Sequence, residues 1–338
     1  MHVSTLDVAD LRLLHALQID PRASFSEVAA ALRTDPATVS RRWNRLHSGG
    51  YVWITGVSGT RGLDGFALID VDCEPARLTA VADELAQDHA IITIERTAGG
   101  RDLLLTVNAG SADQLSSFIV DRLTQTPGVR AVRTHIVVDI FIEGGTWRLR
   151  ELSPAEAAAI PGPAKPRPRA PKTLPPHLVE LVRHELALDG RATPTAIGRR
   201  WNVPAQRVSD AIAAMRHDGR LRMRTDISRR VSDWPVYTWY FVQVPSSAVP
   251  RLRAALTTVP EVRLAALTAG RYNLVLAVWL RDLASIHGFE AALERAVPGA
   301  HIDDRSVVMR IHKHLGHLLD DEGLATGAVI PVFPPPES

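Results

Sequence analysis

Two stretches of the chain carry the same stripe of apolar residues at positions i, i+4 and i+7. The stripes are Val39-Trp43-Leu46 and Val208-Ile212-Met215. Each stripe predicts a helix with one buried face. A glycine ends each predicted helix, Gly50 in the first stretch and Gly219 in the second. These glycines lie 169 residues apart and the flanking sequence repeats at the same offset, so the chain contains one helical unit twice.

Start signals for two consecutive helices precede the first stripe. Ser24, followed three residues later by Glu27, forms a capping box that begins one helix. Asp35 and Pro36 supply the N-cap and the first position of the next helix. Two helices joined by a tight turn predict a helix-turn-helix, a common DNA-reading unit. In the second unit Ala196 replaces the glutamate, so we expect that capping box to be lost.

Strand and helix patterns alternate after each helical unit. The predicted strands are residues 65–73, 91–95, 103–107, 132–142, 237–244, 262–267, 274–280 and 306–312, and the predicted helices are residues 75–87, 112–124, 249–257 and 283–296. Each half therefore has the order β-α-β-β-α-β, which is the ferredoxin-like plan. The predicted fold class is α+β, with two winged helix-turn-helix domains and two ferredoxin-like domains in tandem repeat.

These patterns divide the chain into six segments. The expected bounds are 1–60 and 177–230 for the helix-turn-helix domains, 61–152 and 231–320 for the ferredoxin-like domains, 153–176 for a linker and 321–338 for a tail. The linker is rich in proline and basic residues and predicts a semi-extended polyproline spacer. A basic arm lying in a DNA minor groove is the alternative. Residues 331–338 are expected to be disordered.

Composition narrows the class of protein. The single cysteine, Cys73, excludes an internal disulfide framework and a zinc site of several cysteines. The sequence has no long apolar run and no basic start followed by an apolar stretch, so we expect a cytoplasmic protein with no membrane partner. Positive charge gathers on the helical units: residues 33–61 hold five arginines and one acid, and residues 199–230 hold nine arginines and three acids. Double-stranded DNA is the partner that this distribution favours.

Polar residues on the outer face of the first stripe helix are the candidates for reading DNA. They are Thr38, Ser40, Arg41, Arg42, Asn44 and Arg45. Arg41 lies in the part of a recognition helix that faces base edges and could grip guanine with two hydrogen bonds. Arg42, Arg45 and Arg61 are predicted to hold phosphate instead. The alternative is a helix face that is merely solvated.

The second helical unit offers a different set of candidates. They are Gln206, Arg207, Ser209 and Arg216. Asp210 stands where the first unit has Arg41, and a carboxylate there repels phosphate unless it accepts a hydrogen bond from cytosine. We therefore expect the two units to have diverged and the chain to prefer an asymmetric site.

Motifs in both kinds of domain resemble the Lrp/AsnC (feast/famine) family of transcription regulators. The residues that carry the resemblance are Leu6-Asp7, Asp20, Arg22, Val28-Ala29, Thr38-Val39-Ser40-Arg41-Arg42, Leu46, Gly50, the 97–102 turn and Pro127-Gly128-Val129. The chain is similar to a tandem, double-length member. The resemblance implies sequence-specific DNA binding, a RAM-type second domain, pairing of these domains into homo-oligomers, and a small-molecule effector such as an amino acid.

In the family, a turn of pattern Gly-x-Tyr-Asp contributes to the effector response. The matching turns here are Gly99-Gly100-Arg101-Asp102 and Gly270-Arg271-Tyr272-Asn273. The first turn keeps the acid and lacks the tyrosine, whereas the second keeps the tyrosine and lacks the acid. The resemblance implies that these eight residues contact the effector. A plain hairpin turn, in which glycine with Asp or Asn is common, is the alternative interpretation.

An enzyme with the same two domains is the competing class. Arg271-Tyr272-Asn273 is similar to the Pro-Tyr-Asn stretch of sirohaem decarboxylases, but the proline and a preceding His-Cys-Tyr segment are missing. There is no glycine-rich phosphate loop, nucleophile elbow or metal motif. We therefore expect no enzymatic activity, no catalytic residue, no cofactor and no metal. The histidines at 312, 314 and 317 are interpreted as a charged strand end rather than a metal site.

Overall fold

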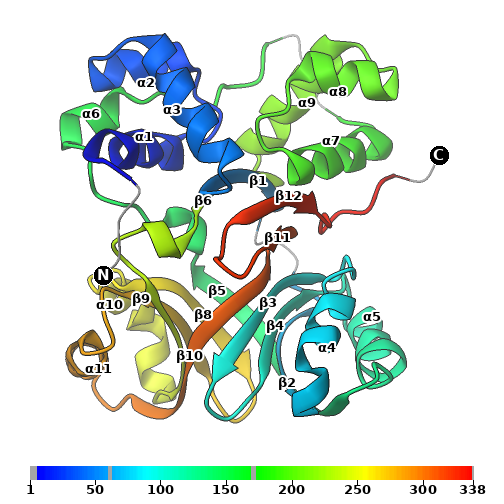
Figure 1. Ribbon diagram of the computed structural model, residues 1–338, viewed down its shortest axis with the longest axis vertical. Coiled ribbons are helices and arrows are strands. Elements are labelled where there is room, and N and C mark those ends of the chain that lie inside the picture. The colour runs from blue at the N-terminus through cyan, green and yellow to red at the C-terminus, as the bar shows by residue number, and fades with distance from the viewer. Residues whose placement is uncertain (1–5, 60–62, 169–172, 337–338) are drawn as a thin grey trace.

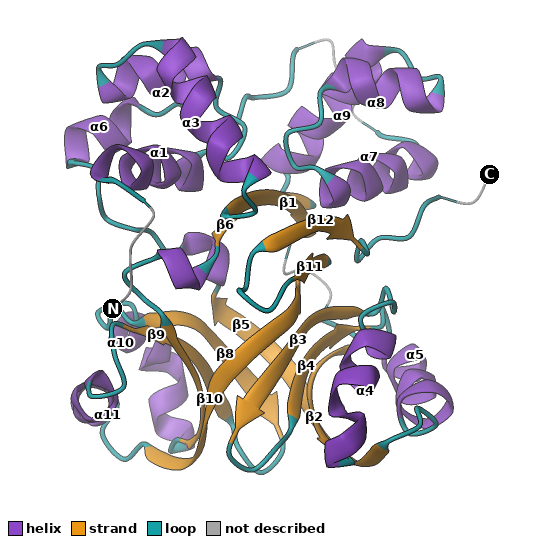
Figure 2. Ribbon diagram, viewed as in Figure 1, coloured by secondary structure: helices purple, strands orange, loops and turns teal. Residues whose placement is uncertain are grey.

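The computed structural model describes residues 6–59, 63–168 and 173–336. Two helical heads lie side by side at one end of the molecule, and a large sheet flanked by helices forms the other end (Figures 1 and 2). Of the residues named above, Arg61 lies outside the described ranges. Within those ranges, no helix combines the length and apolar character that crossing a bilayer requires.

The first head consists of α1 (Val8–Ile19), α2 (Phe25–Leu32) and α3 (Pro36–Ser48). The predicted capping box is confirmed, because Ser24 and Glu27 each accept a hydrogen bond from the other's main-chain N–H. Asp35 caps α3 by accepting from the Thr38 amide. Val39, Trp43 and Leu46 are buried, as the stripe predicted.

The second head repeats this order with α7 (Pro176–Leu188), α8 (Pro194–Trp201) and α9 (Ala205–His217). The loss of the capping box is confirmed, since Thr193 alone caps α8 by accepting from the Ala196 amide. The stripe on α9 is buried here too.

One strand follows each head, and the sequence analysis missed both strands. β1 (Val52–Ser58) pairs antiparallel with β6 (Leu221–Ile227). Thr55 lies opposite Arg224, its own counterpart at the offset of 169 residues. The two heads are therefore related by a local pseudo-two-fold axis that passes between these residues.

The two ferredoxin-like units have the predicted order of elements. The first consists of β2 (Phe66–Cys73), α4 (Leu78–Leu85), β3 (Ile91–Ala98), β4 (Leu103–Asn108), α5 (Ala112–Ser117) and β5 (Val129–Ile142). The second consists of β7 (Val236–Gln243), α10 (Leu252–Leu256), β8 (Val262–Ala269), β9 (Leu274–Leu280), α11 (Ser285–Ala296) and β10 (His301–His314). Each pair of helices covers a cluster of buried aliphatic residues on its own strands.

The strands of both units join into one closed barrel. Their order is β3-β4-β2-β5-β8-β9-β7-β10, and β10 also pairs with β3. The last strand of each unit thus pairs with the second strand of the other unit: β5 pairs with β8, and β10 pairs with β3. Closure removes open sheet edges between the units and buries a shared core.

Two segments differ from their prediction as unstructured chain. The expected polyproline linker contains α6 (Pro154–Ala159), because Ser153 and Glu156 form a capping box and Glu156 pairs with Arg12 of α1. The expected tail contains β12 (Ala325–Val329), which pairs with β11 (His317–Leu319). Beyond it, the Pro331 carbonyl contacts the ring of His89 in the first ferredoxin-like unit, and the Phe333 carbonyl contacts the ring of His184 in the second head. The expectation of disorder is therefore wrong for these residues.

Candidate functional site

The N-terminal half of α3 presents its polar side chains to solvent. Arg41 and Asn44 are exposed, and Thr38 and Ser40 are half-buried. The Arg41 guanidinium donates to Thr38 Oγ1 at 2.8 Å, a contact within the same helix. Such a contact can exchange for a base edge at little cost, because both groups are already near water.

Asp7, the N-cap of α1, and Asp10 in its first turn hold the other two arginines of α3, and no local pattern in the sequence indicated these contacts. Arg42 Nη1 lies 2.8 Å from both Asp7 Oδ2 and Asp10 Oδ1, and Arg45 also pairs with Asp10. The hydrogen bond from Arg42 lowers the pKa of Asp7 below its usual value. The acids offset part of the charge that Arg42 and Arg45 offer to phosphate, although the two arginine side chains remain 30% and 49% exposed.

The acid on α9 that replaces Arg41 binds an arginine from the linker. Arg167 Nε and Nη2 donate to the two oxygens of Asp210 at 2.9 and 2.7 Å, and Gln206 donates to Asp210 as well. The hydrogen bonds from Arg167 hold the pKa of Asp210 below its usual value. Arg167 of the linker thus places a guanidinium on α9 where the first head has Arg41 on α3. The exposed Arg207 lies on the same helix.

Reciprocal contacts fix the two heads to each other. Arg22 and Arg191 are counterparts at the offset of 169 residues, and each donates two hydrogen bonds to main-chain carbonyls of the opposite head. The acceptors are Gly190 and Ala192 for Arg22, and Pro21 and Ala23 for Arg191. Arg216 joins them, with Nη2 at 2.6 Å from Asp20 Oδ1. The structure therefore places Arg216 between the heads, with its side chain only 10% exposed, rather than on the outer face of α9.

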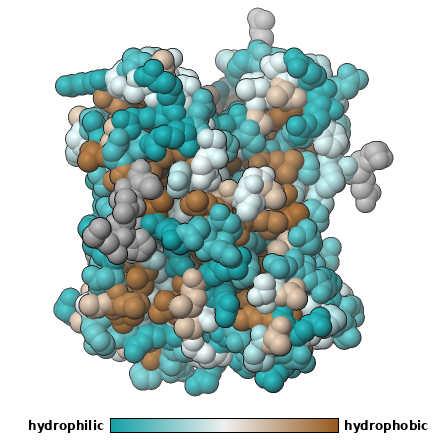
Figure 3. Space-filling model, viewed as in Figure 1, coloured by the Kyte–Doolittle hydropathy of each residue, from teal (hydrophilic) through white to brown (hydrophobic). Residues whose placement is uncertain are grey.

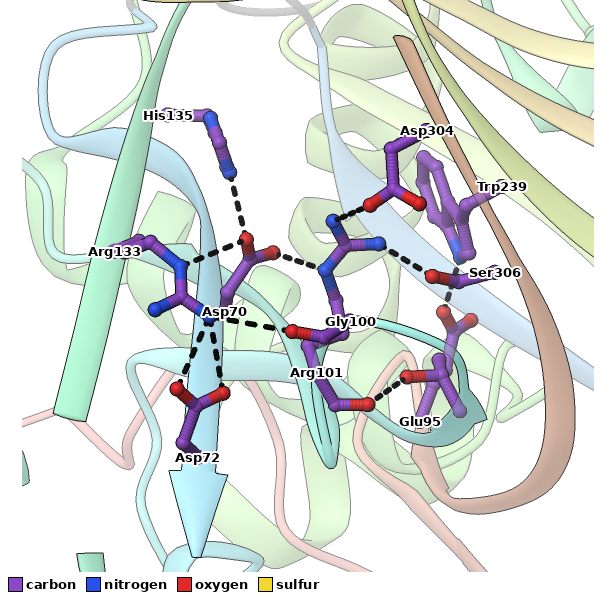
Figure 4. A network of polar contacts seen from close by, with 11 residues as sticks. Asp70, Asp72, Glu95, Gly100, Arg101, Arg133, His135, Trp239, Asp304 and Ser306 are labelled. Carbon is purple, nitrogen blue, oxygen red and sulfur yellow. Dashed lines mark hydrogen bonds and ion pairs between the residues drawn. The ribbon is translucent and has the colours of Figure 1, made fainter. Parts of the chain in front are cut away.

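The first of the two glycine turns places Arg101 in the joint between the barrel halves (Figure 4). Its Nε lies 2.7 Å from Asp70 Oδ1 in the same half, and its Nη2 lies 2.6 Å from Asp304 Oδ2 in the other half. Nη1 donates to Ser306 at 2.5 Å, and the guanidinium lies 3.9 Å from the centre of the Phe241 ring. Arg101 is buried, and its three guanidinium nitrogens face Asp70 as an ion pair, Ser306 as a hydrogen bond and Asp304 as both.

The second turn places Tyr272 in the equivalent position, 171 residues further on. Its ring centre lies 5.6 Å from that of His135 in the other half and 5.3 Å from that of Phe241 in its own half. His135 is the counterpart of Ser306, and Phe241 is the counterpart of Asp70. Aromatic contacts in one half therefore replace the ion pairs of the other.

The last residue of each turn closes on the first strand of its own unit. Asp102 accepts from the Cys73 amide at 2.8 Å, and Asn273 accepts from the Val244 amide at 2.9 Å. Arg271, by contrast, is 74% exposed. The remaining turn residues are Gly99, Gly100 and Gly270. The hairpin alternative accounts for the Asp and Asn side chains, since both hold the turn in place.

The interpretation of the three late histidines as a charged strand end is wrong. His312 and His317 are buried, and burial lowers the pKa of each to about 4. The ring of His317 contacts Thr55 Oγ1 of β1 at 2.9 Å. His312 and His317 are therefore neutral side chains, and His317 joins β11 to β1.

Two stretches in the first half of the chain match known domain families. Residues 6–47 match the AsnC-type helix-turn-helix domain, and residues 66–147 match the Lrp/AsnC ligand binding domain. These matches are to the two kinds of domain that the resemblance implied.

Individual relatives extend this comparison. An uncharacterized HTH-type transcriptional regulator of Pyrococcus furiosus is 29% identical over 138 residues, which are 40% of this chain and 93% of that protein. The HTH-type transcriptional regulator FL11 of Pyrococcus abyssi is 26% identical over 141 residues, 41% of this chain and 92% of that protein. The solved structure of the siroheme decarboxylase NirDL covers 90% of this chain and 91% of its own, with a TM-score of 0.55 and 14% identity. That likeness concerns the fold alone.

Proposed function

We propose that this chain is a sequence-specific DNA-binding transcription regulator whose two heads read the two halves of one site. The observation that carries the proposal is the reciprocal pair Arg22 and Arg191, which fixes two helix-turn-helix units at one end of the molecule. Fixed heads suit two half-sites at a set spacing on DNA. The similarity to proteins named as HTH-type transcriptional regulators supports a regulator rather than an enzyme.

The two halves are proposed to be tandem copies of one unit, with the domain bounds expected from the sequence. Pairing about the axis at Thr55 and Arg224, and the exchange of strands in the barrel, support this origin. The contacts that separate chains would make in a dimer are then made within one chain. Further association of chains into a homo-oligomer is part of the proposal, and the exposed Val138 on β5 offers an apolar side chain for it.

We assign the proposed DNA-binding residues to base reading, phosphate contact or positioning according to the contacts that each one makes. Base reading is assigned to Thr38, Ser40, Arg41 and Asn44 in the first head, and to Gln206, Arg207 and Ser209 in the second. Phosphate contact is assigned to Arg42 and Arg45, whose charge Asp7 and Asp10 moderate. Arg216 is assigned a positioning role through Asp20.

A small-molecule effector such as an amino acid at the two turns also remains a proposal. The match to a ligand binding domain supports it. The side chains of Arg101 and Tyr272 already occupy the joint between the barrel halves, so an effector at this place would act by exchanging with them. Such an exchange would bias the pairing of the halves, and through it the heads.

Replacing Arg41 with alanine is expected to weaken specific DNA binding by about 1–3 kcal/mol, because a bidentate contact to guanine is lost. Arg207→Ala, at a site on the other recognition helix that is also exposed, is the matched control and should cost less. Both variants are titrated by fluorescence anisotropy against a duplex that the wild-type protein enriches from a random pool. Equal losses would show that the first head does not dominate base reading.

A siroheme decarboxylase is the second candidate function, because the fold of NirDL covers nearly the whole chain. The two candidates differ in a simple observable. An enzyme of that class would bind a haem-type substrate and shift its visible absorption band, whereas the regulator would not. Titration of an iron porphyrin carrying carboxylate groups, followed in the visible spectrum, separates them.

A further inference from the structure

A cavity of about 470 Å³ lies between one mouth of the barrel and β1 and β6, the two paired strands that follow the heads. Strands of both halves line it, including β1, β3, β6, β7, β9 and β10, and none of the eight turn residues does. Apolar surface, brown in Figure 3, is visible in the band between the heads and the barrel. The volume is within the range of about 300–1,000 Å³ that small-molecule sites occupy.

Positive charge exceeds negative charge at the centre of this cavity. Asp226 Oδ1 lies 2.7 Å from Arg224 Nη2, 3.0 Å from Arg263 Nη2 and 3.3 Å from His314 Nε2. Two guanidinium groups thus share one buried carboxylate. Burial, followed by the neighbouring Arg224, lowers the pKa of Arg263 to about 9. A buried excess charge is costly unless a counter-charge compensates it.

Seven buried polar atoms of residues that line the cavity have no hydrogen-bond partner among the described residues. Three are Glu95 Oε1, Ser228 Oγ and Arg310 Nε, and the other four belong to Asp226, His314 and two tryptophans. Of these four, two are donors, Trp53 Nε1 and Trp279 Nε1, and one is an acceptor, Asp226 Oδ2. The fourth is His314 Nδ1, which accepts when Nε2 donates to Asp226. Buried polar groups are rarely left unpaired in proteins, since each one costs about 1–3 kcal/mol. All four residues line the cavity.

Flat aromatic side chains form the apolar walls. The Arg263 guanidinium lies 3.6 Å from the centre of the Trp279 ring, and Tyr237 and Trp239 stand beside them with ring centres 5.8 Å apart. Such walls favour a planar ring, which can stack on or edge against them. A ligand that is complementary to this site therefore has an aromatic ring system, a negative charge, and groups that both accept and donate hydrogen bonds.

We propose that this cavity binds a planar aromatic carboxylate that also carries a hydroxyl or amino group. The carboxylate accepts from Arg224, Arg263 and the tryptophan N–H groups. The hydroxyl or amino group donates to Asp226 Oδ2 or His314 Nδ1. This site is separate from the two glycine turns, and the inference goes beyond the proposed DNA-binding function.

Calorimetric titration of the full chain without DNA tests the proposal, so its outcome does not depend on the DNA-binding function. The probes are 3-hydroxy-2-naphthoate, its neutral analogue 3-hydroxy-2-naphthamide, and 2-naphthoate, which lacks the donor. We expect the hydroxy acid to bind at least about tenfold more tightly than the amide, and more tightly than 2-naphthoate. Equal binding of acid and amide, or no binding of the acid at about 1 mM, overturns the proposal.

Variants locate the binding within the cavity. Arg224→Gln removes one guanidinium and leaves Asp226 paired with Arg263, so affinity for the hydroxy acid should fall about tenfold. Arg305→Gln, at an exposed arginine of β10 outside the cavity, is the control and should leave the affinity unchanged. Trp53→Phe keeps an aromatic ring and removes one hydrogen-bond donor. It replaces Arg224→Gln in this test if thermal unfolding shows that Arg224→Gln is misfolded, and its affinity for the hydroxy acid should also fall. Unchanged affinity in a folded cavity variant contradicts the assignment.

Discussion

Replacement of Arg101 by methionine is expected to destabilise the barrel by about 3–5 kcal/mol, the usual cost of breaking a buried ion pair from one side. Arg101 is the one side chain of its turn that contacts Asp70 in its own half and both Asp304 and Ser306 in the other. Methionine fills the space beside Phe241 but leaves the Asp70 carboxylate, which is almost fully buried, with less compensation. Urea unfolding followed by circular dichroism measures the loss.

Arg133→Met is the matched control for this prediction. Arg133 also approaches Asp70 and pairs with Asp72, but its side chain is 52% exposed. Exposed pairs contribute little, so the control should cost less than about 1 kcal/mol. A similar shift of the urea midpoint in both variants would mean that the Arg101 contacts do not hold the barrel halves together.

Replacement of Glu95 by glutamine is expected to stabilise the protein at pH 8 and to have little effect at pH 4.5. Glu95 is buried on β3, and burial raises its pKa from 4.5 to about 7, although the N–H of Trp239 donates to it. Between these two values the unfolded chain releases the proton while the folded chain keeps it. Wild-type stability therefore falls as pH rises from about 4.5 to about 7, by roughly 3 kcal/mol from this group.

The measurement is the difference in unfolding free energy between Glu95→Gln and the wild type as a function of pH. Taking the difference cancels the contribution of groups such as His312 and His317, whose lowered pKa acts in the opposite sense. Glu84→Gln is the control, because Glu84 is exposed beside Arg122 and its replacement removes no buried carboxyl group. A flat difference curve for Glu95→Gln would show that this carboxyl titrates normally in the folded state.

Local patterns were sufficient to predict the capped helices of the heads and the order of elements in each ferredoxin-like unit, but not α6 in the linker. The stripe on α3 and the capping signals at Ser24 and Asp35 act within a few residues of each other, so they are visible in the sequence. The pairing of β1 with β6 is different, because Thr55 and Arg224 are far apart in the chain. β1 shows no clear alternation, and the alternation of β6 between uncharged and charged residues does not reveal its partner. Closure of the barrel through the pairing of β5 with β8 could not be predicted for the same reason, because the two strands are far apart in the chain.

The sequence was sufficient to predict the kind of candidate site, a DNA-reading helix, but not the residues that its arginines contact. The exposed position of Arg41 follows from the helical stripe, whereas the acids that hold Arg42 come from another helix. One signal was available for the second head: Asp210 stands in a basic helix, and the linker supplies arginines that could pair with it. The burial of Arg101 carried no local signal, since glycine turns commonly present a solvated side chain.

The spacing between half-sites tests most directly the claim that one chain holds two reading heads in a fixed relation. Duplexes enriched from a random pool should contain two unlike half-sites whose centres lie about 10 bp, or a multiple of it, apart. Insertion of about 5 bp turns one half-site to the opposite face of the helix and should lower the affinity at least about tenfold. The double variant Arg22→Ala/Arg191→Ala, which lacks the contacts between the heads, should tolerate the insertion better. Enrichment of a single half-site, or wild-type affinity that is indifferent to the insertion, would contradict the account.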